Sequence, residues 1–259
     1  MTSESNSESM PELHTPEPKN FFSRLAGVYF SPRETFEEIG RSPRVLVPII
    51  VLIVISALVG FYLSKNLDLG SIVAGQLEKA VADGRITQEQ MDNQVALVSK
   101  FAGIQLIAGA ALGSLAMTLL IAGGFKLVSG LIGAENRFKA IFAVSTYTMI
   151  AISVVQSALL ILVLHIKGPQ EIDVTNVNSL VASNLGAMLS SVLEEGTLPK
   201  FFMRLAGWID IFAIWAIALL AIGYSAVSRK LKTAKAATWL AVAYGIIAII
   251  GAAIGSLFR

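Results

Sequence analysis

The sequence predicts an all-α, polytopic membrane protein with five transmembrane helices. Hydrophobic residues make up 54% of the chain and charged residues only 15%, whereas soluble domains carry roughly a quarter charged residues. The charges also cluster, and they leave long stretches that carry almost none. A spanning helix needs about 20 predominantly apolar residues. Five stretches meet that length, at about 45–64, 101–125, 140–165, 205–228 and 236–258.

This distribution argues against several classes of protein. A compact soluble enzyme and a DNA-binding domain would both need a more highly charged surface. The chain has no cysteine, which excludes disulfides, thiolate metal sites and cysteine nucleophiles. The net charge of +2 is too close to balance to indicate a nucleic-acid partner. No catalytic constellation is visible, so we expect neither an enzyme nor a cofactor or metal site.

The segment before the first span divides into a tail and two short helices. Residues 1–20 are rich in Ser, Glu and Pro and predict a disordered cytoplasmic tail, followed by one membrane domain over 21–259. The aromatic residues of 21–30 predict an amphipathic helix in the headgroup region, with aromatic side chains toward the lipid and cations toward water. Ser31-Pro32-Arg33-Glu34 then predicts a new helix capped by Ser31, which ends at Gly40.

Two long loops, 65–100 and 166–200, also carry helical patterns. In the first, 72–82 predicts a short helix, and Thr87 with Gln90 has the spacing of a capping box that leads into the second span. We expect both loops to form short helical hairpins that cap the bundle.

The basic residues predict an orientation. With the N-terminus inside, twelve of the twenty Lys and Arg residues fall on the inner side. The other eight fall on the outer side, six of them in the two longer, net acidic loops. The positive-inside rule therefore predicts a cytoplasmic N-terminus and, with five spans, a C-terminus outside.

Asp210 is the one acid inside a span, and such a residue is a functional hypothesis by default. Near a helix N-terminus it also meets the favourable end of the helix dipole, which favours structural placement over a proton or ion relay. Gln105 and Gln156 could reach it across the bundle. These three residues form the candidate intramembrane polar site.

Small residues and one repeated motif complete the pattern. Gly109 with Gly113, and Gly251 with Gly255, have the spacing that lets helices approach closely, either within the bundle or in a homo-oligomer; packing within the bundle is favoured. The seven residues 21–27 recur as 201–207 with six identities, on opposite sides of the membrane by the predicted topology. Their flanks do not match, which favours a shared interfacial composition over an inverted repeat.

Four stretches carry a resemblance to a known family: 21–36 with Ser-Pro-Arg-Glu-Thr-Phe at 31–36, the turn at 133–147, the fourth span from Asp210-Ile211-Phe212 to Gly223, and 228–237. Together with five spans they resemble the Yip family, the Ypt/Rab-interacting membrane proteins, in its prokaryotic form, over about residues 20–258. Eukaryotic members are linked to Rab GTPases, vesicle trafficking and membrane shaping. The tail here lacks the Gln- and Tyr-rich region of many such members, so the resemblance implies a prokaryotic plasma-membrane protein.

We therefore expect a non-enzymatic membrane scaffold, adaptor or organiser that contacts lipids and a cytoplasmic protein partner. The alternative is a small permease or ion-coupled transporter that uses Asp210, and for the surface residues the alternative is ordinary anchoring and orientation. The expected working surface combines aromatic and basic side chains of the inner side: Phe22, Arg24, Phe30, Arg33, Arg137, Lys139, Arg229 and Lys230.

Overall fold

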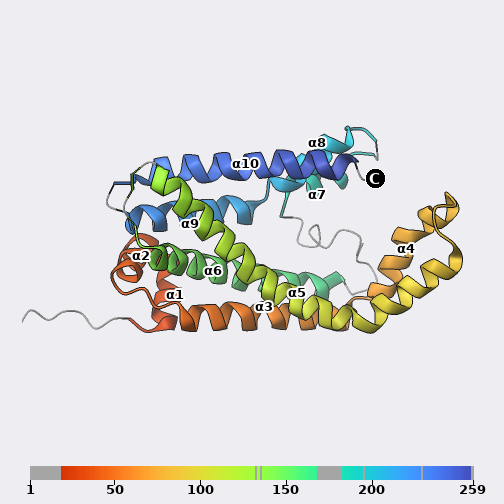
Figure 1. Ribbon diagram of the computed structural model, residues 1–259, viewed down its shortest axis with the longest axis horizontal. Coiled ribbons are helices and arrows are strands. Elements are labelled where there is room, and N and C mark those ends of the chain that lie inside the picture. Colours follow the sequence, from red (N-terminus) through yellow and green to blue (C-terminus); the bar gives the residue numbers. More distant parts are fainter. Residues whose placement is uncertain are drawn as a thin grey trace, which may run out of the picture.

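The computed structural model describes residues 19–131, 133–134, 136–167, 183–194, 196–228 and 230–257, and the described chain is helical with one isolated β-bridge. Most of the predicted tail therefore lies outside the described residues. Figure 1 shows an elongated bundle in which the long helices run side by side. The helices are α1 (Phe21–Phe30), α2 (Pro32–Arg41), α3 (Leu46–Asn66), α4 (Leu69–Ala82), α5 (Gln88–Leu131), α6 (Phe138–Lys167), α7 (Leu185–Ser190), α8 (Lys200–Trp208), α9 (Ile211–Ala226) and α10 (Thr233–Leu257).

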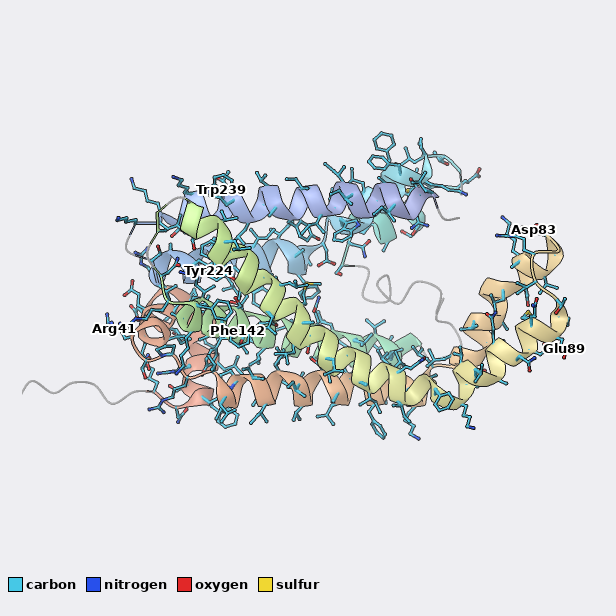
Figure 2. All side chains as sticks on the ribbon, viewed as in Figure 1. Arg41, Asp83, Glu89, Phe142, Tyr224 and Trp239 are labelled. Atoms are coloured by element: carbon cyan, nitrogen blue, oxygen red, sulfur yellow. The ribbon has the colours of Figure 1, made fainter. Side chains whose placement is uncertain are left out.

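Four of these helices, α3, α5, α6 and α10, are long and apolar enough to cross a membrane. The fifth apolar helix, α9, has 16 residues and rises roughly 24 Å, less than the ~30 Å hydrocarbon core. The outer face of α10 carries exposed isoleucine and valine side chains, with Trp239 near its start (Figure 2). An apolar face without a protein partner belongs in lipid, so the prediction of an all-α polytopic membrane protein is confirmed.

The two ends of the bundle differ. We call the end that carries α1, α2 and the α9–α10 connection the N-terminal end, and the opposite end, from which α4 projects, the hairpin end (Figure 1). The core is densest toward the N-terminal end, around α6. There the Tyr224 ring stacks on Phe125 with centroids 3.7 Å apart, and its hydroxyl lies 2.7 Å from Oγ of Ser145. These contacts join α5, α6 and α9.

The α1–α2 pair packs into this core as well as lying on its surface. Val28 of α1 and Phe36 and Ile39 of α2 are fully buried. Tyr29 donates its hydroxyl to the carbonyl oxygen of Ala151 in α6, at 2.8 Å, and burial raises the pKa of the Tyr29 hydroxyl, so it stays a donor. Ser31 directly precedes α2, as predicted, but no backbone N–H of the helix bonds to its side chain. Proline at the first position starts α2 without it.

The first loop forms a helical hairpin, as predicted. Thr87 and Gln90 make the reciprocal capping-box bonds, with Thr87 N–H donating to Oε1 of Gln90 at 2.8 Å and Gln90 N–H donating to Oγ1 of Thr87 at 3.1 Å. The hairpin does not cap the bundle, however. Because α5 is continuous for 44 residues, its first turns carry α4 beyond the hairpin end, and Asp83 and Glu89 lie at the tip (Figure 2).

The expected fourth span, 205–228, is interrupted. The chain leaves the helical path at Ile209 and Asp210, so that α8 ends at Trp208 and α9 begins at Ile211. The hydroxyl of Tyr244, near the midpoint of α10, donates to the carbonyl oxygen of Trp208 at 2.7 Å. The break therefore lies about halfway along the bundle, and α8 accompanies the half of α10 that α9 leaves uncovered (Figure 1).

The two glycine pairs behave differently. A Cβ at Gly251 would lie 2.6 Å from Cζ2 of Trp208, and one at Gly255 would collide with the guanidinium of Arg204. This pair therefore accommodates α8 within the bundle. A Cβ at Gly109 or Gly113 would meet no atom of another helix within 4 Å among the described residues, so the close packing expected at this pair is not seen.

Candidate functional site

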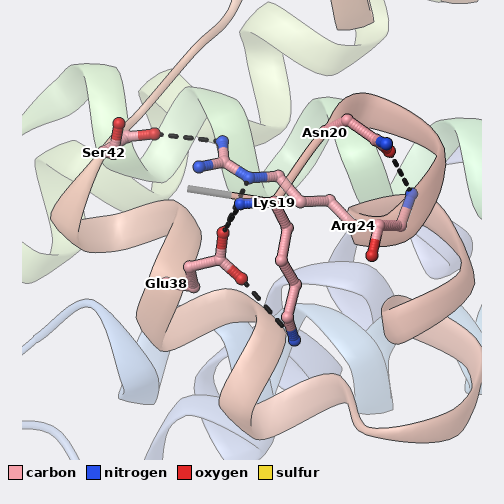
Figure 3. A network of polar contacts seen from close by, with 6 residues as sticks. Lys19, Asn20, Arg24, Glu38 and Ser42 are labelled. Carbon is pink, nitrogen blue, oxygen red and sulfur yellow. Dashed lines mark hydrogen bonds and ion pairs between the residues drawn. The ribbon is translucent and has the colours of Figure 1, made fainter. Parts of the chain in front are cut away.

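An ion-paired network joins α1 to α2 at the N-terminal end (Figure 3). Nε of Arg24 lies 3.2 Å from Oε1 of Glu38, and Nη1 of Arg24 donates to the carbonyl oxygen of Ser42 at 3.1 Å. Lys19 adds its backbone N–H to the same Glu38 oxygen at 2.9 Å. Asn20 caps α1 by accepting from Ser23 N–H at 2.8 Å. These bonds hold α1 and α2 in one fixed relative position.

Arg24 therefore does not belong to the expected contact surface. Only 1% of it is exposed, so the headgroup arrangement predicted for α1, with its cations toward water, is wrong for this residue. The cause is Glu38, which lies on the next helix and draws the guanidinium inward. An amphipathic pattern on one helix does not include such a partner.

The other candidate residues of α1 and α2 are exposed. Phe22 is 77% exposed, Phe30 is 86% exposed and the side chain of Arg33 is 68% exposed. Nε of Arg33 lies 3.2 Å from Oε1 of Glu37. Large apolar side chains beside a cation suit a membrane interface or a protein contact. We call Phe22, Phe30 and Arg33 the N-terminal surface.

The remaining basic candidates flank this surface at the same end. Arg137 and Lys139 lie at the start of α6, Lys230 lies in the α9–α10 connection, and all three are exposed. Arg229 lies outside the described residues. The connection is held close to α2, because a Cβ at Gly40 would lie 2.8 Å from Cγ1 of Val227.

The second candidate region is a cavity of about 1180 Å³ around the break between α8 and α9. Its walls come from α3, α5 and α6 on one side and from α7 to α10 on the other. Phe212 of α9 lines it, as do Ile152 and Gln156 near the midpoint of α6. The cavity therefore lies in the membrane-spanning part of the bundle, from its middle toward the hairpin end.

Asp210 lies in the wall of this cavity and caps α9. Its Oδ1 accepts from the N–H groups of Phe212 at 2.7 Å and Ala213 at 3.1 Å, and its Oδ2 accepts from the hydroxyl of Ser183. Two backbone bonds, from Leu185 N–H to Ile209 and from Ile211 N–H to Ser183, pair this turn with the start of α7. The carboxylate thus holds the broken helix in place, which accounts for an acid at this depth.

The three polar candidates are only partly brought together. Asp210 and Gln156 line the same cavity, whereas Gln105 is exposed on α5 and does not line it. Sequence reasoning missed Arg204 and Tyr244, which also line it. The repeated seven-residue motif could have drawn attention to Arg204, because it places Arg204 at the same position as Arg24. In the part of the chain that the structure describes, no three His, Asp or Glu side chains are placed to hold a metal ion.

Comparison with known proteins assigns the family. The family model of the Yip1 domain matches residues 26–255. The chain belongs to the Yip1 domain family. The match begins within α1 and ends within α10, so it includes α2, the broken α8–α9 segment and the cavity. The Yip resemblance seen in the sequence is confirmed.

A curated bacterial relative also aligns along most of the chain. The membrane protein YknW of Bacillus subtilis is 26% identical over 231 residues, which cover 87% of each chain. No solved structure matches. The family and this relative support an integral membrane location and a prokaryotic member.

Proposed function

We propose that this Yip1 domain protein is a non-enzymatic membrane scaffold or adaptor that works through its N-terminal end. One observation carries the proposal: Phe22 and Phe30 are largely exposed on a helix that is itself fixed in place. The Arg24–Glu38 pair and the Tyr29–Ala151 bond prevent α1 from turning these side chains inward. A rigid surface with aromatic and basic side chains binds with little loss of conformational entropy.

The proposal includes an orientation, with the N-terminal end in the cytoplasm of a prokaryotic plasma membrane and the C-terminus outside. It is supported by the grouping of Arg33, Arg41, Arg137, Lys139 and Lys230 at that end, all exposed. Figure 2 shows Arg41 pointing away from the bundle. Cytoplasmic basic residues can also contact anionic headgroups, so membrane lipids and a soluble protein are the proposed partners.

In-cell photo-crosslinking tests this proposal. A photoreactive residue at position 30 or 138 should capture one reproducible soluble protein, identified by mass spectrometry. Position 246 is the matched control, because Ile246 is exposed on the lipid-facing side of α10 and should capture lipid. Arg33→Glu should reduce capture from position 30, whereas Arg85→Glu at the far hairpin should not. Capture of lipid alone from positions 30 and 138 would overturn the adaptor role.

The break at Ile209–Asp210 favours a second candidate, a small permease. Broken helices near the middle of the membrane form substrate sites in many transporters, and Asp210 and Gln156 line one cavity here. Asp210→Asn keeps an oxygen for the helix cap and removes the charge. A flux of any tested solute in liposomes that Asp210→Asn abolishes would support the permease; flux that the variant leaves unchanged would remove Asp210 from the mechanism.

A further inference from the structure

The cavity contains one basic side chain that lacks a partner. Arg204 of α8 is the sole Lys, Arg or His among the described residues that line it. It is half-buried, and within the described chain no carboxylate, carbonyl or hydroxyl group forms an ion pair or hydrogen bond with it. Its guanidinium lies against Gly255 of α10, where the missing side chain leaves room for it. A cation inside the membrane region normally pairs with an anion or a carbonyl.

Asp210, the acid in the same cavity, does not serve as that anion. Both of its oxygens already accept hydrogen bonds, from two backbone N–H groups and from Ser183. Among the ion pairs of the described residues, none joins Asp210 to Arg204. The charge of Asp210 is offset by the start of α9, so Asp210 does not compensate the charge of Arg204, and no other described residue pairs with it.

The repeated motif shows what Arg204 lacks. Arg24 occupies the same position in 21–27 that Arg204 occupies in 201–207. The two copies fold alike, since Phe21 and Phe22 have ring centroids 5.3 Å apart at 75°, and Phe201 and Phe202 have centroids 5.3 Å apart at 77°. In the first copy the guanidinium has the Glu38 carboxylate and the Ser42 carbonyl. The second copy has no such groups among the described residues.

We propose that the cavity binds a phospholipid, with Arg204 as the group that recognises the headgroup phosphate. A guanidinium binds phosphate oxygens through two parallel hydrogen bonds, so the phosphate takes the place that a carboxylate takes beside Arg24. The walls of the cavity also offer polar and apolar surfaces for the other parts of a phospholipid. Ser153, Gln156 and Ser157 of α6 offer polar groups, and Ile55, Val59 and Leu160 offer an apolar surface for acyl chains.

The size of the cavity and its place in the membrane favour a lipid over a small free anion. At about 1180 Å³ it exceeds the ~300–1000 Å³ typical of small-ligand sites. It lies in the membrane part of the bundle, where phospholipid is the abundant phosphate compound. This inference does not depend on the N-terminal surface.

Native mass spectrometry of the full chain in detergent tests the proposal. The chain is titrated with phosphatidylglycerol, and in separate arms with glycerol phosphate and inorganic phosphate. We expect Arg204→Gln to weaken retention of phosphatidylglycerol about tenfold, as loss of a charged hydrogen-bonding partner predicts. Arg204→Lys should retain part of the affinity. Arg85→Gln, an exposed arginine outside the cavity, is the matched control and should bind as the unaltered chain does.

A second variant covers the case in which Arg204→Gln does not fold. Ala110 lines the same cavity from α5. Ala110→Phe should lower lipid retention by filling space while leaving the guanidinium intact. Equal retention of phosphatidylglycerol by the unaltered chain and both variants would overturn the proposal. Binding of inorganic phosphate as tight as that of phosphatidylglycerol would overturn the assignment to a lipid.

Discussion

Nε of Arg24 lies 3.2 Å from Oε1 of Glu38, and only 1% of Arg24 is exposed. The pair joins two helices, α1 and α2, that precede the first span. The Arg33–Glu37 pair has the same Nε to Oε1 distance, 3.2 Å, but its side chains are 68% and 37% exposed. Burial, more than distance, separates the two pairs in energy.

Glu38→Gln should destabilise the protein far more than Glu37→Gln. Breaking a buried pair leaves a buried charge without its partner and costs about 3 kcal/mol, whereas exposed pairs contribute about 0–1 kcal/mol. Thermal unfolding in detergent, followed by circular dichroism, measures the difference. Equal shifts of Tm in the two variants would contradict the structural role of Glu38.

The effect of replacing Asp210 on the free energy of unfolding should depend on whether the new side chain can still cap α9. Asp210→Ala removes the acceptor for two backbone N–H groups and should lower the free energy of unfolding by about 1 kcal/mol. Asp210→Asn should be nearly neutral, because asparagine caps helices as well as aspartate does. Thermal unfolding of both variants in detergent gives the comparison. An Asn variant as unstable as the Ala variant would show that the charge, and not the cap, matters for folding.

The start of α4 should weaken in acid. The Asp68 carboxylate accepts from the hydroxyl of Ser71 at 2.7 Å and from its N–H at 3.1 Å, and these bonds lower the pKa of Asp68. A lowered pKa in the folded state means that the ionised form is the stabilising one. The contribution is therefore complete above the ordinary aspartate pKa of about 3.9 and is lost as the pH falls through the lower folded value.

Circular dichroism between about pH 5 and pH 2 can measure this loss by comparing the unaltered chain with Asp68→Asn. The variant keeps an uncharged cap at this position, so its helix content should change less over the same range. Identical acid profiles would show that Asp68 does not hold the α4 start.

The proposed orientation can be tested with single cysteines, since the chain has none of its own. A cysteine at Lys139 should react with a membrane-impermeant maleimide only after the cells are opened. A cysteine at Asp83, at the tip of the α4–α5 hairpin, should react in intact cells. The reverse pattern would place the N-terminal end outside.

The fold class could be predicted because uncharged stretches of spanning length leave few other structures for the chain. The break in the fourth span could not. The stretch 205–228 is apolar on both sides of Asp210, and the pairing that forms the break comes from Ser183 and Leu185, more than twenty residues earlier. A hydropathy pattern gives no information about contacts between residues so far apart in the sequence.

The candidate sites show the same limit. Phe22 and Phe30 could be placed at the surface from the pattern of α1 alone, and Arg33 from the pattern of α2 alone. Arg24 could not, because its position depends on Glu38 in the next helix. Asp210 could be singled out by its charge, but not the cavity beside it, which needs the side chains of seven helices.

The two copies of the seven-residue motif also differ in what surrounds them. The glycine that ends each copy lies beside another helix: a Cβ at Gly27 would collide with Thr35 of α2, and Gly207 lies within 3 Å of where a Cβ at Gly186 of α7 would lie. The same short motif thus begins a helix at two places in the bundle, and the neighbouring helix determines whether its arginine is ion-paired within the described residues. The pairing of each arginine therefore depends on residues outside the motif, so substitutions in α2 change the surroundings of Arg24 and leave those of Arg204 as they are.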